Sequence, residues 1–451
     1  MIANEHELRL LPAPDELELS EDVTNPDDDQ LTLVLAPRLR GKLSFFHSEW
    51  KMYEYGVWQS RDNYEMRRYV KSELRKFRRH AVKVNQARIK SIASMLEDEL
   101  FISDRRIMKQ QQEQVRYVNL TNGLFNLDTM EMEEHRPDIY FTNQLSFPYD
   151  PDAECPTFEK YLTSSLVFED GRPDHSLKTL VLEALAYSMT ARTDLKASFW
   201  LVGQKDSGKS TFIALIKAIM GDLHTTIDLT QLGENRFLLA SIMSKRVVTF
   251  TEASSSMMLP DALYKALTGG SDEIYADRKN KEPIVFRPEA KVWWAMNEMP
   301  RISDRSGATT RRIVIIPFNR SIPADERIHN LEALLYKERS GIFNLLIHYM
   351  WRLKKQNGFD YCQQSDDLLQ QYIMENDTEA TFIEEMADVH ESYKVQSSVL
   401  YPQYVEWCLQ NGFKPKNRNQ IAKEWRRLGF INRTSNGVWW HGLQLRSNFQ
   451  K

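Results

Sequence analysis

A glycine-rich segment near the middle of the chain has the spacing of a phosphate-binding turn. Residues 203–210 read GQKDSGKS, which satisfies G-x-x-x-x-G-K-[ST] in full. In this pattern the glycines let backbone N–H groups turn inward around phosphates, the lysine reaches the β- and γ-phosphates, and the serine hydroxyl binds magnesium. The segment therefore predicts a site for ATP and Mg²⁺. The residues expected to bind the nucleotide are Gly203, Gln204, Lys205, Asp206, Ser207, Gly208, Lys209, Ser210 and Thr211.

Two segments after this turn end in polar residues that hydrolysis would need. Glu252 follows RVVTFT (246–251), and a carboxylate there would hold Mg²⁺ together with Ser210 and act on the attacking water. Asn297 follows KVWWAM (291–296), and its amide could orient that water or touch the γ-phosphate. A solvated glutamate at a strand end and an ordinary turn asparagine are the alternatives.

A pair of arginines, Arg311 and Arg312, opens the apolar run that ends at Phe318. A guanidinium at the edge of a sheet could complete the γ-phosphate site of a neighbouring subunit as an arginine finger. A structural salt bridge is the competing interpretation. The pair is therefore a catalytic candidate whose partner lies in another copy of the chain.

Apolar strand-like runs alternate with helical segments between residues 196 and 320. This alternation is typical of a parallel sheet with helical crossovers. It predicts an α/β fold whose core is a P-loop NTPase. The expected strands and helices occupy 198–203, 210–221, 245–253, 259–270, 286–297 and 312–318.

The composition limits the classes of protein that remain. The chain has 451 residues and a net charge of −4, which excludes a histone-like protein coated in positive charge. No apolar run reaches the length of a membrane span, and the acidic N-terminus lacks a signal pattern, so we expect a cytoplasmic protein with no membrane partner. Three cysteines far apart in the sequence exclude a disulfide framework.

Changes in composition predict five regions along the chain. The first 35 positions contain ten acidic residues and a single basic residue, Arg9, a composition that is typical of a disordered leader. An acidic arm that binds a partner or mimics DNA is the alternative. The regions are an acidic tail (1–40), an α+β and helical collar domain (41–190), the ATPase core (191–335), a helical lid or linker (336–375) and a winged-helix domain (376–451).

Basic residues gather in two helical segments outside the core. In the tract Arg67–Lys90, positions 68, 71, 75, 78 and 79 share a helical face, which could line a ring and touch DNA or simply be solvated. Near the C-terminus, two helices and a hairpin turning at Asn436-Gly437 form a winged-helix pattern. That unit could dock on DNA or on a protein.

The order of these motifs resembles the core of superfamily 3 helicases, in the poxvirus-type and phage or plasmid primase-helicase branch of AAA+ ATPases. The matching segments are the turn, VVTFTE, LYKALTGG, ADRKNKEPIVFRP, WWAMNEMPRISD and RRIVIIPF. NLTNGLFNL and FPYDPDAECPTFEKYL resemble the domain before the ATPase in that branch. The resemblance covers about residue 45 to the end.

The resemblance implies a homohexameric ring that hydrolyses ATP, moves along single-stranded DNA and unwinds forked duplex. It makes Glu252 the Walker B glutamate, Asn297 sensor 1, and Arg312 or its neighbour Arg311 the arginine finger. It also implies a basic hairpin in the central pore. The residues of that hairpin expected to contact DNA are Arg278, Lys279 and Lys281, and a solvated hairpin tip is the alternative.

Two features depart from the family pattern. Thr251, not a second acid, precedes Glu252. No primase domain is expected, since the D-x-D sequence Asp150-Pro-Asp152 is predicted to be a structural turn, and priming is left to a separate primase or polymerase. An ATP-regulated origin-binding or loading factor remains the alternative function. A signalling GTPase is less consistent with the sequence, which lacks an N-K-x-D base reader.

Overall fold

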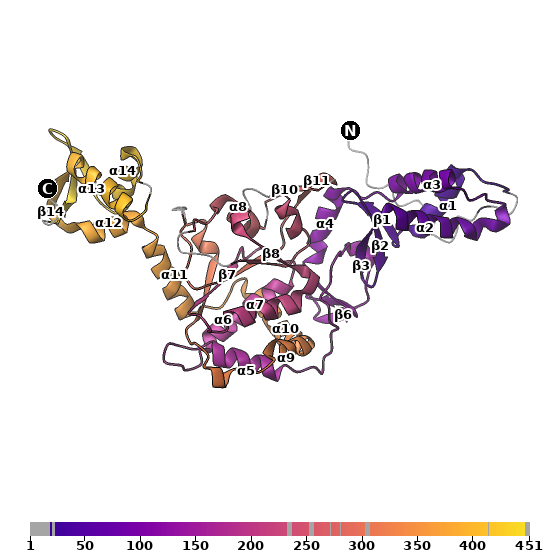
Figure 1. The fold of residues 1–451 in the computed structure, drawn as a ribbon, viewed down its shortest axis with the longest axis horizontal. Helices are drawn as coiled ribbons and strands as arrows, with labels where there is room; N and C mark the ends of the chain where they lie inside the picture. Colours follow the sequence, from indigo (N-terminus) through magenta and orange to yellow (C-terminus); the bar gives the residue numbers. More distant parts are fainter. Residues whose placement is uncertain are drawn as a thin grey trace. The chain divides into compact units, whose positions relative to one another are not determined.

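The computed structural model describes residues 19, 23–231, 237–251, 257–270, 272–279, 281–302, 307–413 and 415–446 (Figure 1). Contacts divide the chain into two compact units. The larger unit consists of residues 1–300 and 304–364, and the smaller unit of 301–303 and 365–451.

A five-stranded sheet forms the centre of the larger unit, and all of its neighbouring strands pair in parallel. This confirms the predicted α/β fold with a parallel sheet. The order along the sheet places β7 between β13 and β12, so that strands distant in sequence become neighbours. The strands, in sheet order, are β13 (Ile313–Phe318), β7 (Ser198–Gly203), β12 (Lys291–Met296), β9 (Val247–Phe250) and β8 (His224–Ile227).

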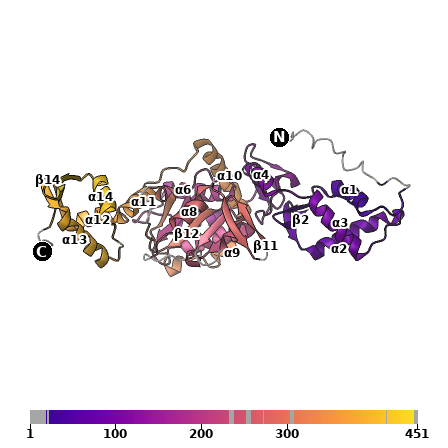
Figure 2. The same ribbon diagram turned by 90° about the horizontal axis from the view of Figure 1, so that it is seen from above.

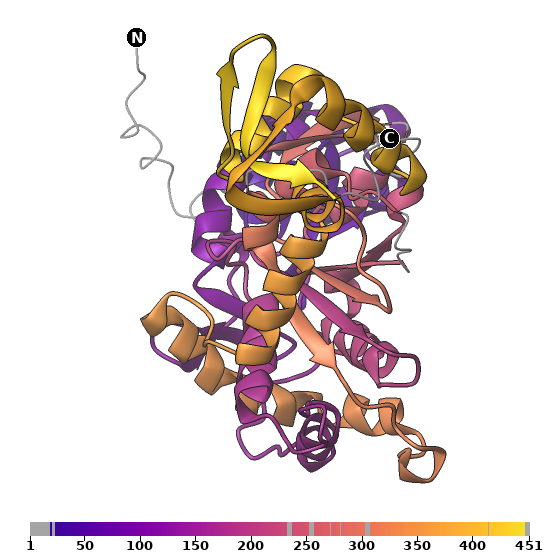
Figure 3. The same ribbon diagram turned by 90° about the vertical axis from the view of Figure 1, so that its left-hand side faces the viewer.

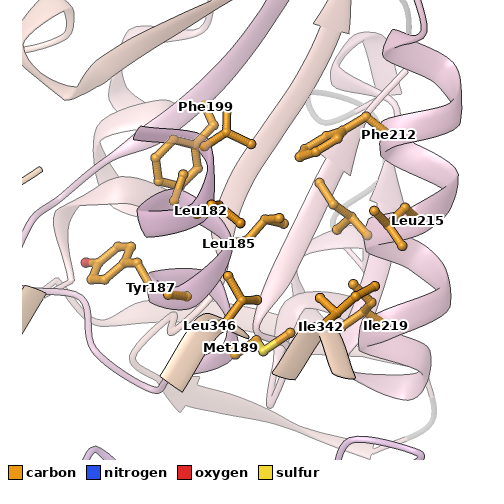
Figure 4. Packing of buried hydrophobic residues seen from close by; sticks show 14 of the residues in the cluster. Leu182, Leu185, Tyr187, Met189, Phe199, Phe212, Leu215, Ile219, Ile342 and Leu346 are labelled. Atoms are coloured by element: carbon orange, nitrogen blue, oxygen red, sulfur yellow. The ribbon is translucent and has the colours of Figure 1, made fainter. Parts of the chain in front are cut away.

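Helices with apolar faces cover this sheet and bury its side chains in one core. Figure 4 shows this packing, in which Leu182 and Leu185, Phe199, Phe212 and Ile342 meet from four different elements. Burial of such side chains contributes on the order of 1.5–3 kcal/mol each. The helices of this region are α5 (Pro156–Ser165), α6 (His175–Met189), α7 (Lys209–Met220), α8 (Asp261–Gly269), α9 (Leu331–Lys337) and α10 (Arg339–Gln356).

The structure draws no boundary at residue 190, where the collar domain was predicted to end. Helix α6 precedes that point, yet its apolar residues share a core with strand β7 and helix α7. The indole of Trp293 in β12 also donates to the Ser188 hydroxyl at 2.9 Å. Helix α6 therefore belongs with the five-stranded sheet, because its apolar residues cover one face of it.

The first part of the larger unit combines helices with a small antiparallel sheet (Figure 2). The elements are α1 (Asp28–Leu39), β1 (Leu43–Phe46), β2 (Glu49–Glu54), β3 (Val57–Arg61), α2 (Asn63–Leu74), α3 (Gln86–Glu99) and α4 (Asp104–Gln114).

The predicted tail of residues 1–40 must be shortened. Helix α1 occupies 28–39, where Asp27 and Gln30 form a capping box and Leu31, Val34 and Leu35 are buried. Three of the ten acidic residues that suggested disorder lie at the start of this helix, Asp27 as its N-cap and Asp28 and Asp29 in its first turn, where negative charge favours a helix. Residues 1–18 lie outside the described residues, so the remaining part of the predicted tail stays a prediction.

Two hairpins complete the larger unit. The segment NLTNGLFNL (119–127) lies in a hairpin of β4 (Tyr117–Leu120) and β5 (Gly123–Asn126), which β6 (Glu131–Glu133) extends to three strands. Strands β10 (Ile274–Arg278) and β11 (Lys281–Phe286) form the other hairpin. Short 3-10 helices are η2 (Arg75–His80), η3 (Pro137–Ile139), η4 (Gly221–Leu223), η5 (Leu229–Gln231), η6 (Leu238–Ile242), η7 (Thr310–Arg312) and η8 (Ala324–Glu326).

The smaller unit has its own apolar core and a three-stranded antiparallel sheet (yellow in Figure 3). It starts at Ser365, near the beginning of α11, and not at the predicted residue 376, because α11 groups with the elements after it. The winged-helix assignment stays a prediction. The elements are α11 (Gln363–Glu375), α12 (Thr378–Met386), β14 (Ala387–Gln396), α13 (Ser397–Gln410), α14 (Arg418–Arg427), β15 (Ile431–Thr434) and β16 (Val438–Leu445).

Candidate active site

The glycine-rich turn joins the end of β7 to the start of α7, as its mechanism requires. Gly203 lies so close to the backbone carbonyl of Phe318 in β13 that a β-carbon there would collide with it. Gly208 has φ +98°, a conformation that side chains other than glycine rarely adopt, and it caps α7 without a side-chain hydrogen bond. The first N–H groups of the 12-residue helix therefore face the turn without a capping side chain, the arrangement in which helix N-termini bind anions.

The amine of Lys209 lies inside this turn and is bound by its backbone. The ammonium donates to the carbonyl oxygens of Gly203 at 2.7 Å and Gln204 at 2.6 Å, and to the Ser207 hydroxyl at 3.2 Å. Lys209 is buried, whereas the next residue, Ser210, is exposed at the first turn of α7. The turn thus concentrates one cation and one hydroxyl at the start of a helix.

Residues outside the motif hold the turn in shape, and the sequence did not single them out. The Tyr161 hydroxyl of α5 donates to the Gly208 carbonyl at 3.0 Å, and complete burial raises the pKa of that phenol well above its usual range. After β13, the Ile322 N–H donates to the Asp206 carbonyl at 2.9 Å and the Ser321 hydroxyl to the Lys205 carbonyl at 3.0 Å. No sequence motif marks these contacts, because they join segments 47 and 116 positions apart.

Of the two polar residues predicted to take part in hydrolysis, Asn297 is among the described residues and Glu252 is not. Met296 is in register with Val202, so Asn297 leaves β12 at the same edge where β7 enters the turn, and its side chain is exposed. Glu252 lies outside the described residues. Strand β9, which precedes it, ends at Phe250, and the Thr251 carbonyl accepts a hydrogen bond of 2.7 Å from the Trp294 indole.

The arginine pair lies at the opposite end of β13 from the turn. Ile313 pairs with Ser198 and Phe318 with Gly203, so about 17 Å of strand separates the two ends. Arg312 is buried and donates to the Ala308 carbonyl, whereas Arg311 is exposed. Neither arginine can therefore reach the turn of its own chain from this position.

The predicted DNA-contacting hairpin is tied to strand β2. Glu49 accepts from the Lys281 ammonium at 2.6 Å and lies 3.4 Å from the Arg278 guanidinium. Arg278 also donates to the His47 carbonyl at 2.8 Å, and its side chain is only 10% exposed. Lys279, at the tip, is exposed. We call the contact of Glu49 with Arg278 and Lys281 the hairpin clamp.

Charges around the hairpin clamp shift two pKa values. Burial would raise the pKa of Glu49, but hydrogen bonds from Lys281 and Ser60 and the charge of Lys51 outweigh it and hold that pKa at about 2. Burial lowers the pKa of His47 to about 4, although Asp104 acts in the opposite direction from 3.7 Å. Glu49 is therefore ionised and His47 neutral near pH 7.

Other predicted features can be located directly. Asp150 and Asp152 form the expected turn, in which the Asp152 N–H donates to the Asp150 carboxylate at 3.1 Å. All three cysteines are buried thiols without a disulfide. Among the described residues, no group of three His, Cys, Asp or Glu side chains could hold a metal ion. Of the helices that the structure places, none is long and apolar enough to cross a bilayer.

Three protein families match separate segments of the chain. Residues 36–167 match the family described as "D5 N terminal like", and residues 374–438 match "Poxvirus D5 protein-like". The segment between them, 201–312, contains the turn and the arginine pair and matches a "Family of unknown function (DUF5906)". The three matches follow the order of the predicted regions.

Several viral proteins are similar to this chain. "Putative helicase L207/L206" of Acanthamoeba polyphaga mimivirus is 29% identical over 209 residues, which are 45% of this chain and 21% of that protein. "Putative helicase 184R" of Invertebrate iridescent virus 6 is 27% identical over 242 residues (51% and 24%), and "Putative helicase V13" of Sputnik virophage is 22% identical over 246 residues (51% and 30%). The matched region is less than a third of each relative.

A solved structure matches along almost the whole chain. The apo structure of the "NrS-1 C terminal region" superposes with a TM-score of 0.53 at 14% sequence identity, covering 93% of this chain and 100% of that one. At this identity the likeness shows the fold. Together the matches confirm the predicted resemblance to D5-like superfamily 3 helicases and support a helicase or NTPase family.

Proposed function

We propose that this D5-like chain is the motor of an ATP-dependent DNA helicase, which assembles as a homohexameric ring, moves along single-stranded DNA and unwinds forked duplex. The observation that carries the proposal is the turn at Lys209. It lies between a buried strand and the start of a helix, at the same sheet edge as Asn297. Ligands bind at this edge of open parallel sheets.

In this proposal the turn from Gly203 to Thr211 binds ATP. The Lys209 ammonium exchanges the two carbonyl oxygens that it now contacts for phosphate oxygens, which are stronger acceptors because they are charged. Ser210 and Glu252 would hold Mg²⁺, which neutralises charge on the phosphates when bound. The exposed Ser210 hydroxyl fits that role, and the lack of a three-ligand cluster among the described residues suits an ion held largely by phosphate and water. Asn297 would orient the attacking water.

The position of the arginine pair supports assembly into a ring. Because Arg311 and Arg312 lie at the far end of β13, an arginine can meet a γ-phosphate only across a subunit boundary. Exposure favours Arg311 as the finger, since Arg312 is buried and bonded to its own loop. Arg311 thus becomes the preferred candidate for the arginine finger, whereas the family resemblance put Arg312 first.

We assign contact with DNA to the hairpin residues Arg278, Lys279 and Lys281. Cations on a short loop suit transient contacts with successive phosphates. The predicted collar and winged-helix domains would hold the ring and its substrate, and a separate primase or polymerase would supply priming. We place the protein in the cytoplasm of the host cell.

Strand displacement on a forked substrate tests the proposal directly. We expect ATP-dependent displacement by the full chain and loss of both hydrolysis and displacement in Lys209→Ala, with a measured particle mass of about six protomers in the presence of nucleotide. ATP hydrolysis without displacement would indicate the origin-binding or loading alternative. Hydrolysis by pure Lys209→Ala protein would overturn the assignment of the turn.

Subunit mixing tests the arginine finger. Arg311→Ala and Glu252→Gln proteins should each be inactive in ATP hydrolysis, and mixing them should restore part of the activity if Arg311 acts on a neighbour's nucleotide. Arg312→Lys is the matched comparison, because it keeps a cation at the buried position. Rescue with Arg312→Ala but not with Arg311→Ala would return the finger to Arg312.

A further inference from the structure

The helical segment after β3 carries a concentration of positive charge that is unusual for this chain. Residues 62–90 contain ten Lys and Arg against three Asp and Glu, whereas the whole chain has a net charge of −4. Most of these cations are exposed. We define the basic face as the exposed residues Arg67, Arg68, Lys71, Arg75, Arg78, Arg79 and Lys83.

The geometry of α2 fixes several of these cations in a row. Met66, Val70 and Leu74 bury one side of the helix in the apolar core of this region, and Asp62 caps its start through bonds to the Tyr64 and Glu65 N–H groups. Positions 64, 68 and 71 in α2, and position 75 directly after it at the start of η2, follow the i, i+4, i+7, i+11 spacing of one helical side away from that buried side. They span about 16 Å along the axis, so the row is rigid and longer than a single phosphate group.

The carboxylates of this segment do not neutralise the basic face. Glu65 is used in the capping box with Asp62, and Glu73 pairs with Lys76 at 2.7 Å. Arg88, outside the face, pairs with Asp28 of α1 at 2.8 Å. Across the described part of the chain, no carboxylate lies within ion-pair distance of the basic-face residues. The face therefore presents uncompensated charge, which is the electrostatic pattern of a polyanion-binding surface.

An exposed aromatic ring lies in the same row. The Tyr64 side chain is 63% exposed, and the guanidinium carbon of Arg68 lies 6.0 Å from the centre of its ring. An aromatic side chain among cations provides a platform on which a base can stack beside its phosphate. This combination points to nucleic acid more than to an acidic peptide.

We propose that the basic face binds the sugar–phosphate backbone of DNA, as a second contact separate from the predicted hairpin. The inference rests on the proposed function, because DNA is the substrate there. Arg68, Lys71 and Arg75 bind successive phosphates, and Tyr64 stacks on an unpaired base where the strand is single. The face thus holds DNA on the collar side of the motor.

Salt-dependent DNA binding tests the inference with the full-length protein. Fluorescence anisotropy would be measured on a labelled duplex and a labelled single strand for R68Q/K71Q/R75Q, since glutamine keeps the helix propensity of the replaced residues. The matched control is K160Q/K217Q/K337Q, which removes three exposed helical lysines elsewhere and changes the net charge equally. Thermal melting by circular dichroism checks that each variant is folded.

We expect the basic-face variant alone to bind DNA more weakly. Losing three phosphate contacts should reduce the slope of log K against log salt by about 2.7 on duplex or about 2 on a single strand. Tyr64→Ala should weaken binding of the single strand but not of the duplex. Equal affinity and slope for the two triple variants on both substrates would overturn the inference.

The outcome separates this inference from the proposed function. If the unaltered protein binds and unwinds DNA while the basic-face variant binds as tightly as the control, only the second contact is refuted. If the unaltered protein binds neither substrate at any salt concentration, both the helicase proposal and the second contact fail. A loss confined to the basic-face variant supports both.

Discussion

Two sets of cations in this chain could contact a phosphate backbone, and they differ in whether carboxylates pair with them. In the hairpin clamp, Arg278 and Lys281 are paired with Glu49. On the basic face of α2, cations such as Lys71 and Arg75 have no carboxylate near them among the described residues. The first set already stabilises the fold, whereas the second set repels itself. If DNA binds at both surfaces as we propose, it has to break ion pairs at the hairpin but relieves repulsion on the helix.

This difference suggests that the two surfaces have different roles in the proposed contact with DNA. A surface whose charge is uncompensated attracts DNA at long range and at low energetic cost. A hairpin whose cations are clamped can engage only when a phosphate replaces a carboxylate, so its contact can be made and released. We infer that the basic face contributes affinity and that the hairpin contributes movement.

The largest expected effect comes from the hairpin tip. Lys279→Ala with Lys281→Ala should reduce strand displacement to the ATP-free background, because the moving contact loses both ammonium groups. Binding of a fluorescent ATP analogue monitors the nucleotide site in the same protein. The single change Lys279→Ala is the cleaner test, since Lys279 is exposed whereas Lys281 also pairs with Glu49. Displacement that survives the double change would contradict a motor role for the hairpin.

The next effect concerns the hairpin clamp. Glu49→Gln removes the charge that pairs with Arg278 and Lys281, and it should lower the stability of the fold by about 1–3 kcal/mol, as expected for a partly buried charged hydrogen-bond acceptor. Freed cations should also raise DNA affinity roughly two- to fivefold, the factor for an ion pair of up to about 1 kcal/mol. Thermal melting and anisotropy measure the two changes.

A matched control lies on the same strand. Glu54 pairs with Arg61 at 2.5 Å within the small sheet, and among the described residues no ion pair joins it to the hairpin. Glu54→Gln should leave DNA affinity unchanged. If both variants bind DNA equally, the hairpin clamp does not compete with DNA.

Low pH should destabilise the fold near the hairpin clamp through protonation of His47. Its pKa is about 4 when folded and near 6.5 in an unfolded chain, so the unfolded chain takes up the proton first as the pH falls. Stability from this residue is therefore complete above about pH 6.5 and decreases as the pH falls toward 4. His47→Asn should flatten the dependence of melting temperature on pH in this window, and asparagine suits the positive φ of +55°.

A second buried histidine provides a comparison for that measurement. The pKa of His224 is also lowered to about 4, mainly by burial, so His224→Asn should flatten the same curve independently. Below about pH 4.5 the protonation of Glu49, whose pKa is about 2, destabilises the fold further. An unchanged slope in His47→Asn would show that the imidazole is not buried as described.

The sequence predicted the central α/β region well where its signals are local. The alternation of apolar runs and helices identified four of its five strands and missed the short strand β8, and the glycine spacing identified the turn that β7 and α7 position. The strand order and the register that brings Asn297 beside the turn depend on pairing between distant segments. Helix α1 was missed although the sequence contains its capping residues Asp27 and Gln30 and the apolar residues Leu31 and Leu35, because the acidic residues and prolines before it dominate the composition of the first 35 positions.

Which cations pair with a carboxylate could not be predicted from the sequence. Arg278, Lys281 and the basic helix looked alike in sequence, as exposed positive charge. Glu49, which distinguishes them, lies 232 positions before Lys281, and nothing local to either residue indicates the pairing. The same holds for Tyr161, which holds the turn through Gly208. Compensation of charge is a property of tertiary packing and could not be predicted from spacing.

The smallest expected effect tests whether the basic face costs stability. Every charged helical neighbour of Lys71 and Arg75 three or four positions away is a cation, so Lys71→Gln with Arg75→Gln should stabilise the fold by a few tenths of a kcal/mol per relieved pair. Melting at low salt should reveal the gain, and about 1 M salt should abolish it, because screening removes the repulsion. K160Q/K217Q should show neither effect. A loss of stability in the helix variant would mean that these cations already have a compensating partner, and the contrast with the hairpin clamp would disappear.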